Sequence, residues 1–247
     1  MPTFNYGLAP GAIIITGAAS GIGRATAMEA FRQGLDVIAW DLDQSGLADL
    51  KTHMEGGGAA SARVATSVVD IADSASVKSA MRAATSHFAP SYLVNNAGPA
   101  ARSELPFGEA LAKSLIATHD LTELWLESDP CDPVLVNVCS AAGNVIAGPT
   151  DWYSAGKAGL AGYTRSLAGK RPKGLRANAV APGFIDTPRL TPLFSSEEGR
   201  GQVARNPLKR AGRPEEIATL ILFLLSPGAS YMNGALIVCD GGSSLAF

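Results

Sequence analysis

The sequence has few of the residues that build disulfide-rich, basic or membrane-spanning proteins. Its only three cysteines, Cys131, Cys139 and Cys239, form no Cys-x-x-Cys pair, so they indicate buried apolar residues in a reducing compartment rather than a metal site or a disulfide framework. The formal net charge of −2 argues against a nucleic acid or an anionic membrane as partner. The longest apolar runs, such as residues 221–225, are far too short to span a bilayer.

Apolar residues make up 47% of the 247 residues, which is enough for a sizeable core. The N-terminus lacks the charged-then-apolar pattern of a signal peptide, and no repeat or linker divides the chain. We therefore expect a single α/β domain over residues 1–247 and a cytoplasmic location.

The first structural motif is a strand, a glycine-rich turn and a helix. Residues 12–16 are a short β-branched run that is typical of a buried parallel strand. The pattern Gly-x-x-x-Gly-x-Gly follows over residues 17–23, and residues 24–33 have helical composition and end at Gly34. Such a unit presents helix-terminal N–H groups to a pyrophosphate, although an isolated glycine-rich turn also fits an ordinary loop.

An acidic residue follows the second predicted strand. Residues 37–40 are apolar, and Asp41 comes next, close to the interval of ~20 residues expected for an acid that binds the adenosine ribose. A carboxylate there accepts hydrogen bonds from ribose hydroxyls and repels a 2′-phosphate, so NAD is favoured over NADP. The alternatives are an ordinary surface acid, or its neighbour Asp43 in the same role.

Further apolar runs predict the remaining strands and helices. Ser74 is expected to cap the helix that follows the third strand, and residues 107–128 and 152–169 have helical patterns. The expected strands are residues 62–69, 92–94, 134–138, 175–180 and 236–239.

The chemistry is expected in the segment Tyr153-Ser-Ala-Gly-Lys157, with Ser140 upstream. A tyrosine and a lysine four residues apart share one face of a helix, and the ammonium then stabilises the phenolate. Such a tyrosine exchanges a proton with a substrate hydroxyl, while the Ser140 hydroxyl holds the same oxygen. Taken alone, most Tyr-x-x-x-Lys pairs are solvated helix surface.

Taken in order, these motifs resemble the classical short-chain dehydrogenase/reductase family. The resemblance rests on the glycine turn after Thr16, Asp41, Asp70-Ile71, Asn95 to Gly98, Ser140, Tyr153-x-x-x-Lys157, and Pro182-Gly183 with Thr187. It implies a Rossmann-type, doubly wound domain with a seven-stranded parallel sheet of order 3-2-1-4-5-6-7 and helices on both faces. It also implies a homotetramer or homodimer.

The resemblance further implies catalytic and cofactor-binding residues. Ser140, Tyr153 and Lys157 are the implied catalytic residues, and Tyr153 and Lys157 also contact the cofactor. The other implied cofactor-binding residues are Gly17, Ser20, Gly21, Ile22, Gly23, Asp41, Asp70, Ile71, Asn96, Ala97, Gly98, Pro182, Gly183, Ile185 and Thr187.

One family position differs in this sequence. Where the family usually has a catalytic Asn that kinks the helix and anchors a water, the best alignment places Ser114. A hydroxyl donates and accepts, so Ser114 is the candidate to hold that water. His119 is nearby in sequence, but a single histidine on a helix is more often structural.

Residues 187–210 are rich in proline and glycine and are expected to form a mobile substrate lid. Apolar residues of this segment and of two others suggest an apolar pocket, whereas Arg102, Arg189 and Arg205 suggest an acidic substrate instead. The apolar set is Val145, Ile146, Trp152, Phe184, Leu190, Leu193 and Phe194.

The leading hypothesis is an NAD-dependent enzyme that interconverts a small-molecule secondary alcohol and a ketone. A non-catalytic NAD-binding regulator is one alternative, to which the change at Ser114 gives some room. Reduction of a 3-oxoacyl group on a carrier protein is another, but it usually goes with NADPH and a basic docking patch, and Asp41 argues against it.

Overall fold

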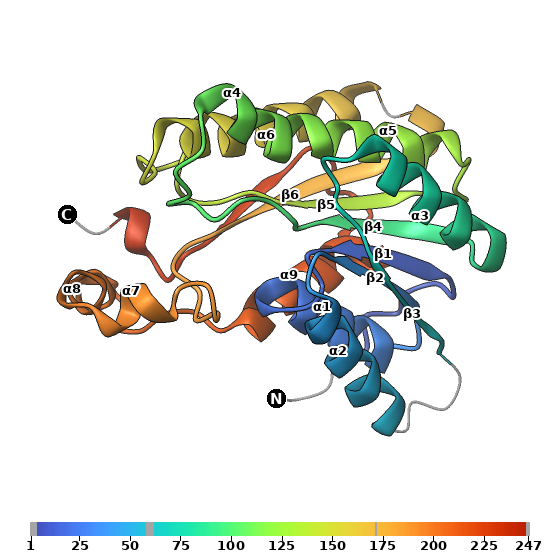
Figure 1. Cartoon of the computed structure of the whole chain (residues 1–247), viewed down its shortest axis with the longest axis horizontal. Coiled ribbons are helices and arrows are strands. Elements are labelled where there is room, and N and C mark those ends of the chain that lie inside the picture. Colours follow the sequence, from blue (N-terminus) through green and yellow to red (C-terminus); the bar gives the residue numbers. More distant parts are fainter. Residues whose placement is uncertain (1–3, 58–61, 171, 246–247) are drawn as a thin grey trace.

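The computed structural model describes residues 4–57, 62–170 and 172–245. These residues form a seven-stranded sheet of order β3-β2-β1-β4-β5-β6-β7, and every neighbouring pair is parallel (Figure 1). Helices cover both faces, so the predicted fold class and strand order are confirmed.

The central strands are short runs of mostly apolar residues that are largely buried on both faces, as expected for a parallel sheet, whereas the edge strands β3 and β7 are only partly buried. Ile13, Ile14 and Ile15 of β1 are fully buried, which stabilises the fold by about 1.5–3 kcal/mol for each side chain. The strands are β1 (Ala12–Thr16), β2 (Asp36–Asp41), β3 (Val64–Val68), β4 (Pro90–Asn95), β5 (Val134–Val138), β6 (Arg176–Pro182) and β7 (Leu236–Cys239).

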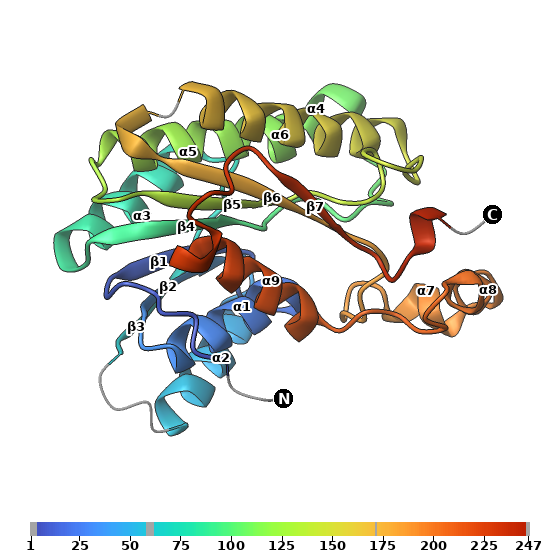
Figure 2. The same cartoon turned by 180° about the vertical axis from the view of Figure 1, so that it is seen from behind.

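The helices pack in two layers (Figures 1 and 2). The helices α1 (Gly21–Arg32), α2 (Gln44–Gly56) and α9 (Pro214–Leu225) pack on one face, and α3 (Ser74–His87), α5 (Ala117–Glu127) and α6 (Asp151–Lys170) pack on the other. A short helix α4 (Phe107–Leu111) and a π-helical turn η1 (Ala112–Ile116) run directly into α5.

Two helix ends show how local chemistry selects a boundary. Gly34 has φ +87°, a left-handed conformation that glycine adopts without strain, and it follows the end of α1 as predicted. The prediction of Ser74 as N-cap of α3 is wrong, because the carboxylate of Asp73 accepts the Ala75 N–H at 2.9 Å. Ser74 becomes the first helical residue instead.

Buried amides join the middle of the sheet to the helices above it. Asn95 donates through Nδ2 to Thr122 Oγ1 at 3.0 Å and to Asn137 Oδ1 at 2.9 Å, and Asn137 Nδ2 donates to Thr164 Oγ1 at 2.9 Å. These four side chains are almost completely buried, so losing one partner would leave a costly unpaired polar atom. The network therefore holds α5 and α6 in place over β4 and β5.

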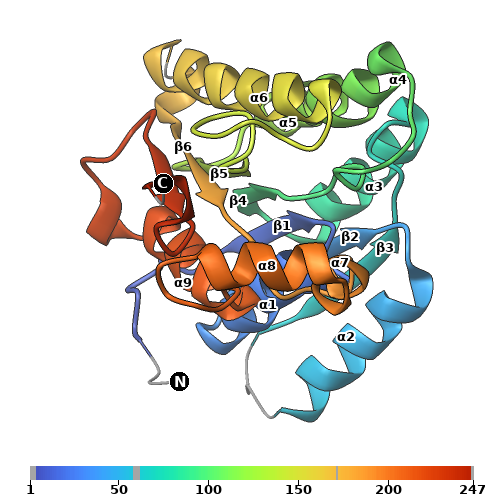
Figure 3. The ribbon, with the colours of Figure 1, turned by 90° about the vertical axis from the view of Figure 1, so that its left-hand side faces the viewer.

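The segment expected to be an irregular lid contains two helices, α7 (Thr191–Ser195) and α8 (Glu197–Arg205). The Ser196 hydroxyl accepts the Gly199 N–H at 3.1 Å and so caps α8. A serine at this position can indicate the start of a helix, but the prolines and glycines of the segment indicated a loop instead. Figure 3 shows both helices beyond the carboxyl ends of the central strands.

Candidate active site

Ser140, Tyr153 and Lys157 come together at the carboxyl end of β5. Lys157 Nζ donates to the Val138 carbonyl at 2.8 Å, two residues before Ser140, and lies 5.8 Å from the centroid of the Tyr153 ring. The hydroxyl of Ser140 accepts the Ala142 N–H at 3.2 Å. A cation, a phenol and a hydroxyl thus gather at the sheet edge where open parallel sheets bind their ligands.

The first turn of α6 is anchored by Trp152. Its side chain is only 3% exposed, and its ring meets the Tyr153 ring edge-on with centroids 5.6 Å apart. Trp152 therefore belongs to the core, and its predicted place in the lining of an apolar pocket is wrong. Val145 and Ile146, on the loop between Ser140 and α6, are 48% and 39% exposed and remain available to a substrate.

The glycine turn before α1 has room only for glycine at its key positions. Gly17 and Gly21 have φ of +68° and +53°. A Cβ on Gly23 would lie 2.0 Å from the Gly17 carbonyl oxygen, so the turn and the helix pack without side chains between them. Ser20 is exposed and does not cap α1 with its side chain. This arrangement fits a pyrophosphate at the N-terminus of α1.

Asp41, the predicted ribose ligand, is fixed beside the glycine turn by two main-chain hydrogen bonds. Its Oδ2 accepts the Ala19 N–H at 2.9 Å, and its Oδ1 accepts the Asp43 N–H at 3.0 Å, so the carboxylate is fixed beside the glycine turn. Asp43 is instead the N-cap of α2, because its carboxylate accepts the N–H groups of Ser45 and Gly46.

A single hydroxyl joins β1 to the segment after β4. Thr16 Oγ1 is buried and accepts the N–H groups of both Asn96 and Ala97 at 3.0 Å. In return, Asn96 Nδ2 donates to the carbonyls of Thr16 and Gly17 at 3.0 and 3.1 Å. The residues before Gly98 are thereby held beside the glycine turn, as the predicted cofactor site requires.

The other predicted cofactor residues lie along the same edge. Thr187 is close enough to Gly21 that a Cβ there would lie 3.0 Å from Thr187 Cγ2. Gly183 follows β6 and donates to the Cys239 carbonyl at 3.1 Å, and Ile185 is buried in a bridge to Gly212. Pro182 is the last residue of β6.

Asp70 and Ile71 follow β3. Asp70 is exposed and accepts the Ala72 N–H at 2.9 Å, while Ile71 packs partly buried against the core. Both residues lie at the carboxyl edge of the sheet, as the resemblance implies for contacts with the adenine.

Ser114 lies in the middle of the π-helical turn η1. Its hydroxyl donates to the Ala110 carbonyl at 2.7 Å, and a Cβ on Gly156 would lie 3.2 Å from its Oγ. Ser114 thus faces the residue just before Lys157, and a π-turn is often found at functional sites. His119, by contrast, is exposed and pairs with Asp120 at 2.8 Å, with its ring centroid 5.1 Å from that of Tyr163.

The segment that begins at Gly98 contacts residues 187–210, the predicted lid. Arg102 pairs with Glu198 of α8 at 2.8 Å, and Arg189 donates to the Gly98 carbonyl at 3.2 Å. Phe184 and Phe194 meet edge-on with centroids 6.5 Å apart. Two of the three arginines considered for an acidic substrate are therefore engaged in contacts between loop and lid.

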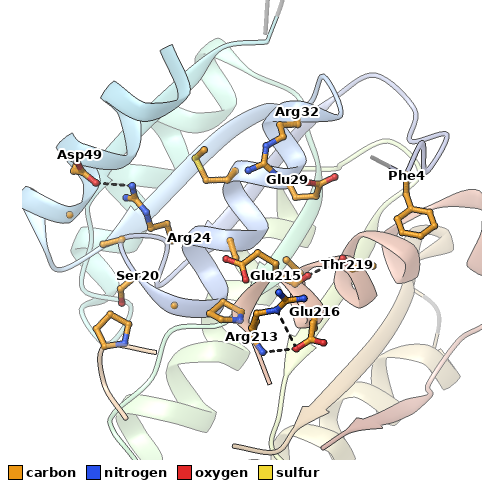
Figure 4. A pocket seen from close by; sticks show the side chains of 18 of the residues that line it. Phe4, Ser20, Arg24, Glu29, Arg32, Asp49, Arg213, Glu215, Glu216 and Thr219 are labelled. Atoms are coloured by element: carbon orange, nitrogen blue, oxygen red, sulfur yellow. Dashed lines mark hydrogen bonds and ion pairs between the residues drawn. The ribbon is translucent and has the colours of Figure 1, made fainter. Parts of the chain in front are cut away.

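A groove of about 1000 Å³ runs along α1, between α2 and the start of α9, and begins at the glycine turn (Figure 4). Ser20 and Gly21 line its end nearest the glycine turn, whereas Ser140, Tyr153 and Lys157 do not line it. Two ion pairs join residues that line the groove, Arg24 with Asp49 at 2.7 Å and Arg32 with Glu29 at 2.6 Å. The groove therefore reaches the predicted cofactor-binding turn but does not include the predicted catalytic residues.

Two further features of the described chain bear on the site. Among residues 4–57, 62–170 and 172–245, no His, Cys, Asp and Glu side chains gather in a set of three or more suited to a metal ion. Within the same ranges, no helix has the length and apolar character needed to cross a membrane.

Sequence reasoning missed the role of Asn144. Its side-chain amide donates to the carbonyl of Ser140 at 2.8 Å and to that of Lys157 at 3.3 Å. The only signal in the sequence is an asparagine after Gly143 in a loop of small residues, which by itself indicates a turn.

Comparison with known proteins agrees with this geometry. The profile of a family described as "Enoyl-(Acyl carrier protein) reductase" matches residues 17–244. The chain is 37% identical to cis-4-hydroxycyclohexanecarboxylate dehydrogenase of Sinomonas cyclohexanicum, over 93% of this chain and 94% of that protein. It is 34% identical to a 3-oxoacyl-(acyl-carrier-protein) reductase of Thermotoga maritima, over 93% and 96% of the two chains.

The fold agrees as well. The crystal structure of levodione reductase superposes with a TM-score of 0.86 at 32% identity, covering 96% of this chain and 98% of that one.

Proposed function

The chain belongs to the short-chain dehydrogenase/reductase family of nicotinamide-dependent oxidoreductases, and from that premise we propose that it interconverts a secondary alcohol and a ketone with NAD(H). The observation that carries the proposal is the gathering of Ser140, Tyr153 and Lys157 at the end of β5, with Lys157 Nζ 5.8 Å from the Tyr153 ring. These groups supply a proton acceptor, a cation that stabilises it and a hydroxyl that orients the substrate.

A nicotinamide cofactor, held by the residues of the glycine turn and by Asp41, would supply or accept the hydride. During alcohol oxidation the Tyr153 phenolate removes the hydroxyl proton as the carbonyl forms, and during reduction the phenol returns it. The Lys157 ammonium stabilises the phenolate through its positive charge. The Ser140 hydroxyl donates to the substrate oxygen, on which negative charge develops.

Replacing Tyr153 by Phe tests this function. We expect Tyr153→Phe to lower kcat by at least 10²-fold, because the proton acceptor is gone, and to leave the Kd of NADH within about threefold. Tyr231→Phe is the control, since it removes the hydroxyl of a fully exposed tyrosine that belongs to none of the proposed sites. Oxidation of cyclic alcohols is followed by NADH absorbance, and full turnover by Tyr153→Phe would reject the mechanism.

The preferred cofactor is NAD rather than NADP. The Asp41 carboxylate is fixed beside the glycine turn by the N–H groups of Ala19 and Asp43, and its charge opposes a 2′-phosphate. Its oxygens retain lone pairs for ribose hydroxyls.

The proposed substrates are alcohols and ketones of six-membered rings. One similar protein is named for such a compound, cis-4-hydroxycyclohexanecarboxylate dehydrogenase. The exposed apolar side chains of Val145 and Ile146 beside Ser140, and the Phe184–Phe194 pair, suit an apolar ring. Residues 187–210, with α7 and α8, form the substrate lid in this proposal.

A second candidate function is the reduction of 3-oxoacyl groups on a carrier protein, favoured by the 34% identity to the Thermotoga maritima reductase. Turnover of a 3-oxoacyl thioester with NADPH that exceeds turnover of cyclic ketones with NADH would favour it. A purely regulatory NAD-binding protein, which the serine at position 114 left open, would show neither turnover.

The protein is proposed to work in the cytoplasm as a homo-oligomer of two or four copies. Its three cysteines are free, which suits a reducing compartment, but Cys131 is exposed, so its predicted burial is wrong. An apolar hollow between α6 and the segment formed by η1 and α5 is the proposed contact between copies. Ile116, within it, is 52% exposed. The residues that line this hollow, here named the helical patch, are Leu115, Ile116, His119, Gly159 and Tyr163.

A further inference from the structure

The loop between Ser140 and α6 is held by one asparagine side chain. Asn144 Nδ2 donates to the Ser140 carbonyl at 2.8 Å and to the Lys157 carbonyl at 3.3 Å. Both hydrogen atoms of one amide are therefore directed to the main chain of two different catalytic residues. Ser140 comes from the end of β5 and Lys157 from the second turn of α6, so the amide joins two elements.

The surrounding turn is rigid enough to give this bridge a fixed position. The Ala141 carbonyl accepts the N–H groups of Asn144, Val145 and Ile146 at 2.9–3.2 Å, and Ala141 N–H donates to the Pro182 carbonyl at 2.8 Å. Gly143 has φ +85°, and a Cβ there would lie 2.5 Å from the Ser154 carbonyl oxygen. The turn thus lies against the first turn of α6, where only glycine fits.

The Lys157 carbonyl can accept this bond without loss to the helix. In an α-helix each carbonyl accepts the N–H four residues later, and its second lone pair stays available. The Asn144 amide uses that lone pair, and so it sets the distance between the helix turn that carries Lys157 and the loop that carries Ser140.

We propose that Asn144 is a positioning residue for the reaction, which holds the main chains of Ser140 and Lys157 at a fixed separation. The Ser140 hydroxyl is thereby directed to the substrate oxygen, and the Lys157 ammonium to the Tyr153 phenol. This role rests on the proposed dehydrogenase function. In this role Asn144 contacts only the main chain of Ser140 and Lys157, and neither substrate nor cofactor.

Another hydrogen bond of the same loop provides a matched control. The Ser154 hydroxyl accepts the Gly148 N–H at 3.0 Å and donates to the Thr150 carbonyl at 3.1 Å. It ties the loop to α6 as Asn144 does, but it touches the main chain of neither Ser140 nor Lys157. Ser154→Ala therefore measures the effect of loosening the loop in general.

The test compares Asn144→Ala, Asn144→Asp and Ser154→Ala. We expect kcat for a cyclic alcohol to fall at least tenfold in Asn144→Ala, and further in Asn144→Asp, whose carboxylate faces two carbonyl oxygens. The Kd of NADH, from fluorescence titration, is expected to stay within threefold. Ser154→Ala is expected to keep kcat within threefold at a similar loss of Tm. Equal losses of kcat in Asn144→Ala and Ser154→Ala would overturn the proposal.

Hydrogen exchange separates this proposal from the proposed function. Asn144→Ala is expected to speed amide exchange in both residues 140–146 and residues 157–161, whether or not the chosen substrate is turned over, and unchanged exchange there overturns the bridge. Loss of the proposed function would instead appear as an inactive wild type with normal NADH binding. If Asn144→Ala does not fold, Asn144→Ser, whose hydroxyl is too short to reach both carbonyls, replaces it in each comparison.

Discussion

At the scale of single residues, two neighbouring carboxylates do different work. Asp41 accepts the Ala19 N–H at 2.9 Å and lies beside the glycine turn, whereas Asp43 accepts the N–H groups of Ser45 and Gly46 at the start of α2. Hydrogen bonds from Ser45 and Gly46 lower the pKa of Asp43 below its ordinary value, which suits a helix cap. The cofactor preference is therefore expected to depend on Asp41 alone.

Neutralising each carboxylate in turn tests this division. Asp41→Asn keeps the shape and one acceptor but removes the charge that opposes a 2′-phosphate, so kcat/KM for NADP relative to NAD is expected to rise at least tenfold. Direct titration with NADPH should show the same change in Kd. Asp43→Asn is the control and is expected to lower Tm without changing the ratio of kcat/KM for NADP to that for NAD. A change of this ratio in Asp43→Asn but not in Asp41→Asn would contradict the role of Asp41.

At the scale of elements, the small residues of α6 differ in what surrounds them. A Cβ on Gly159 would lie 2.7 Å from Leu115 Cδ2, so α6 packs closely against η1 at this point. A Cβ on Gly162 meets only the end of the Arg165 side chain at 4.0 Å. Only the fold shows which glycines of α6 require close packing.

Alanine at these two glycines should have opposite effects. Gly162→Ala is expected to stabilise the protein by about 0.5–1 kcal/mol, because alanine restricts the unfolded chain and favours the helix. Gly159→Ala is expected to lose that gain and to be about 1–2 kcal/mol less stable than Gly162→Ala, since Leu115 must move. Urea unfolding measures both, and equal stability of the two variants would refute the close contact.

The start of α9 depends on an ionised carboxylate. Glu216 accepts the Arg213 N–H at 2.7 Å and pairs with Arg210 at 2.7 Å. The hydrogen bond from the Arg210 side chain, followed by that from the Arg213 backbone, lowers the pKa of Glu216 to about 2 from an ordinary value of 4.5. A lowered pKa stabilises the fold above the unfolded value, and this stabilisation is lost as pH falls from 4.5 towards 2.

Glu216→Gln removes the charge and keeps an acceptor for the Arg213 N–H. At pH 7 the variant is expected to be about 1 kcal/mol less stable than the wild type, a modest value because the ion pair is partly exposed. The difference should begin to narrow below about pH 4.5, when the wild-type carboxylate is progressively protonated in the unfolded state. Urea unfolding at pH 7, 5 and 4 measures this difference in the free energy of unfolding. A difference that widens as pH falls would show that the ionised Glu216 carboxylate does not stabilise the fold.

At the scale of the whole molecule, the helical patch is the surface proposed to join copies of the chain. Ile116→Lys places a charge within it and is expected to shift the oligomer to smaller species by light scattering. Leu42→Lys is the control, because Leu42 is 66% exposed and lies outside the patch. An unchanged mass for Ile116→Lys would place the contact elsewhere.

Much of this protein was predictable from its sequence because the responsible signals are local. Runs such as Ile13-Ile14-Ile15 predict buried parallel strands, and the left-handed turns at Gly17 and Gly34 need glycine whatever lies around them. Tyr153 and Lys157 share a helix, so their spacing alone places them on one face. The family resemblance followed from these patterns in their order along the chain, and the strand order followed from the resemblance.

Only the tertiary structure could show contacts between distant segments. Asn144 reaches Lys157 because the loop folds back on α6, and Ser114 faces Gly156 through a π-turn that its sequence does not announce. Trp152 is in the core rather than in the pocket for the same reason. Side-chain partners depend on which elements pack together, and packing is decided by the burial of the whole chain rather than by any one stretch of it.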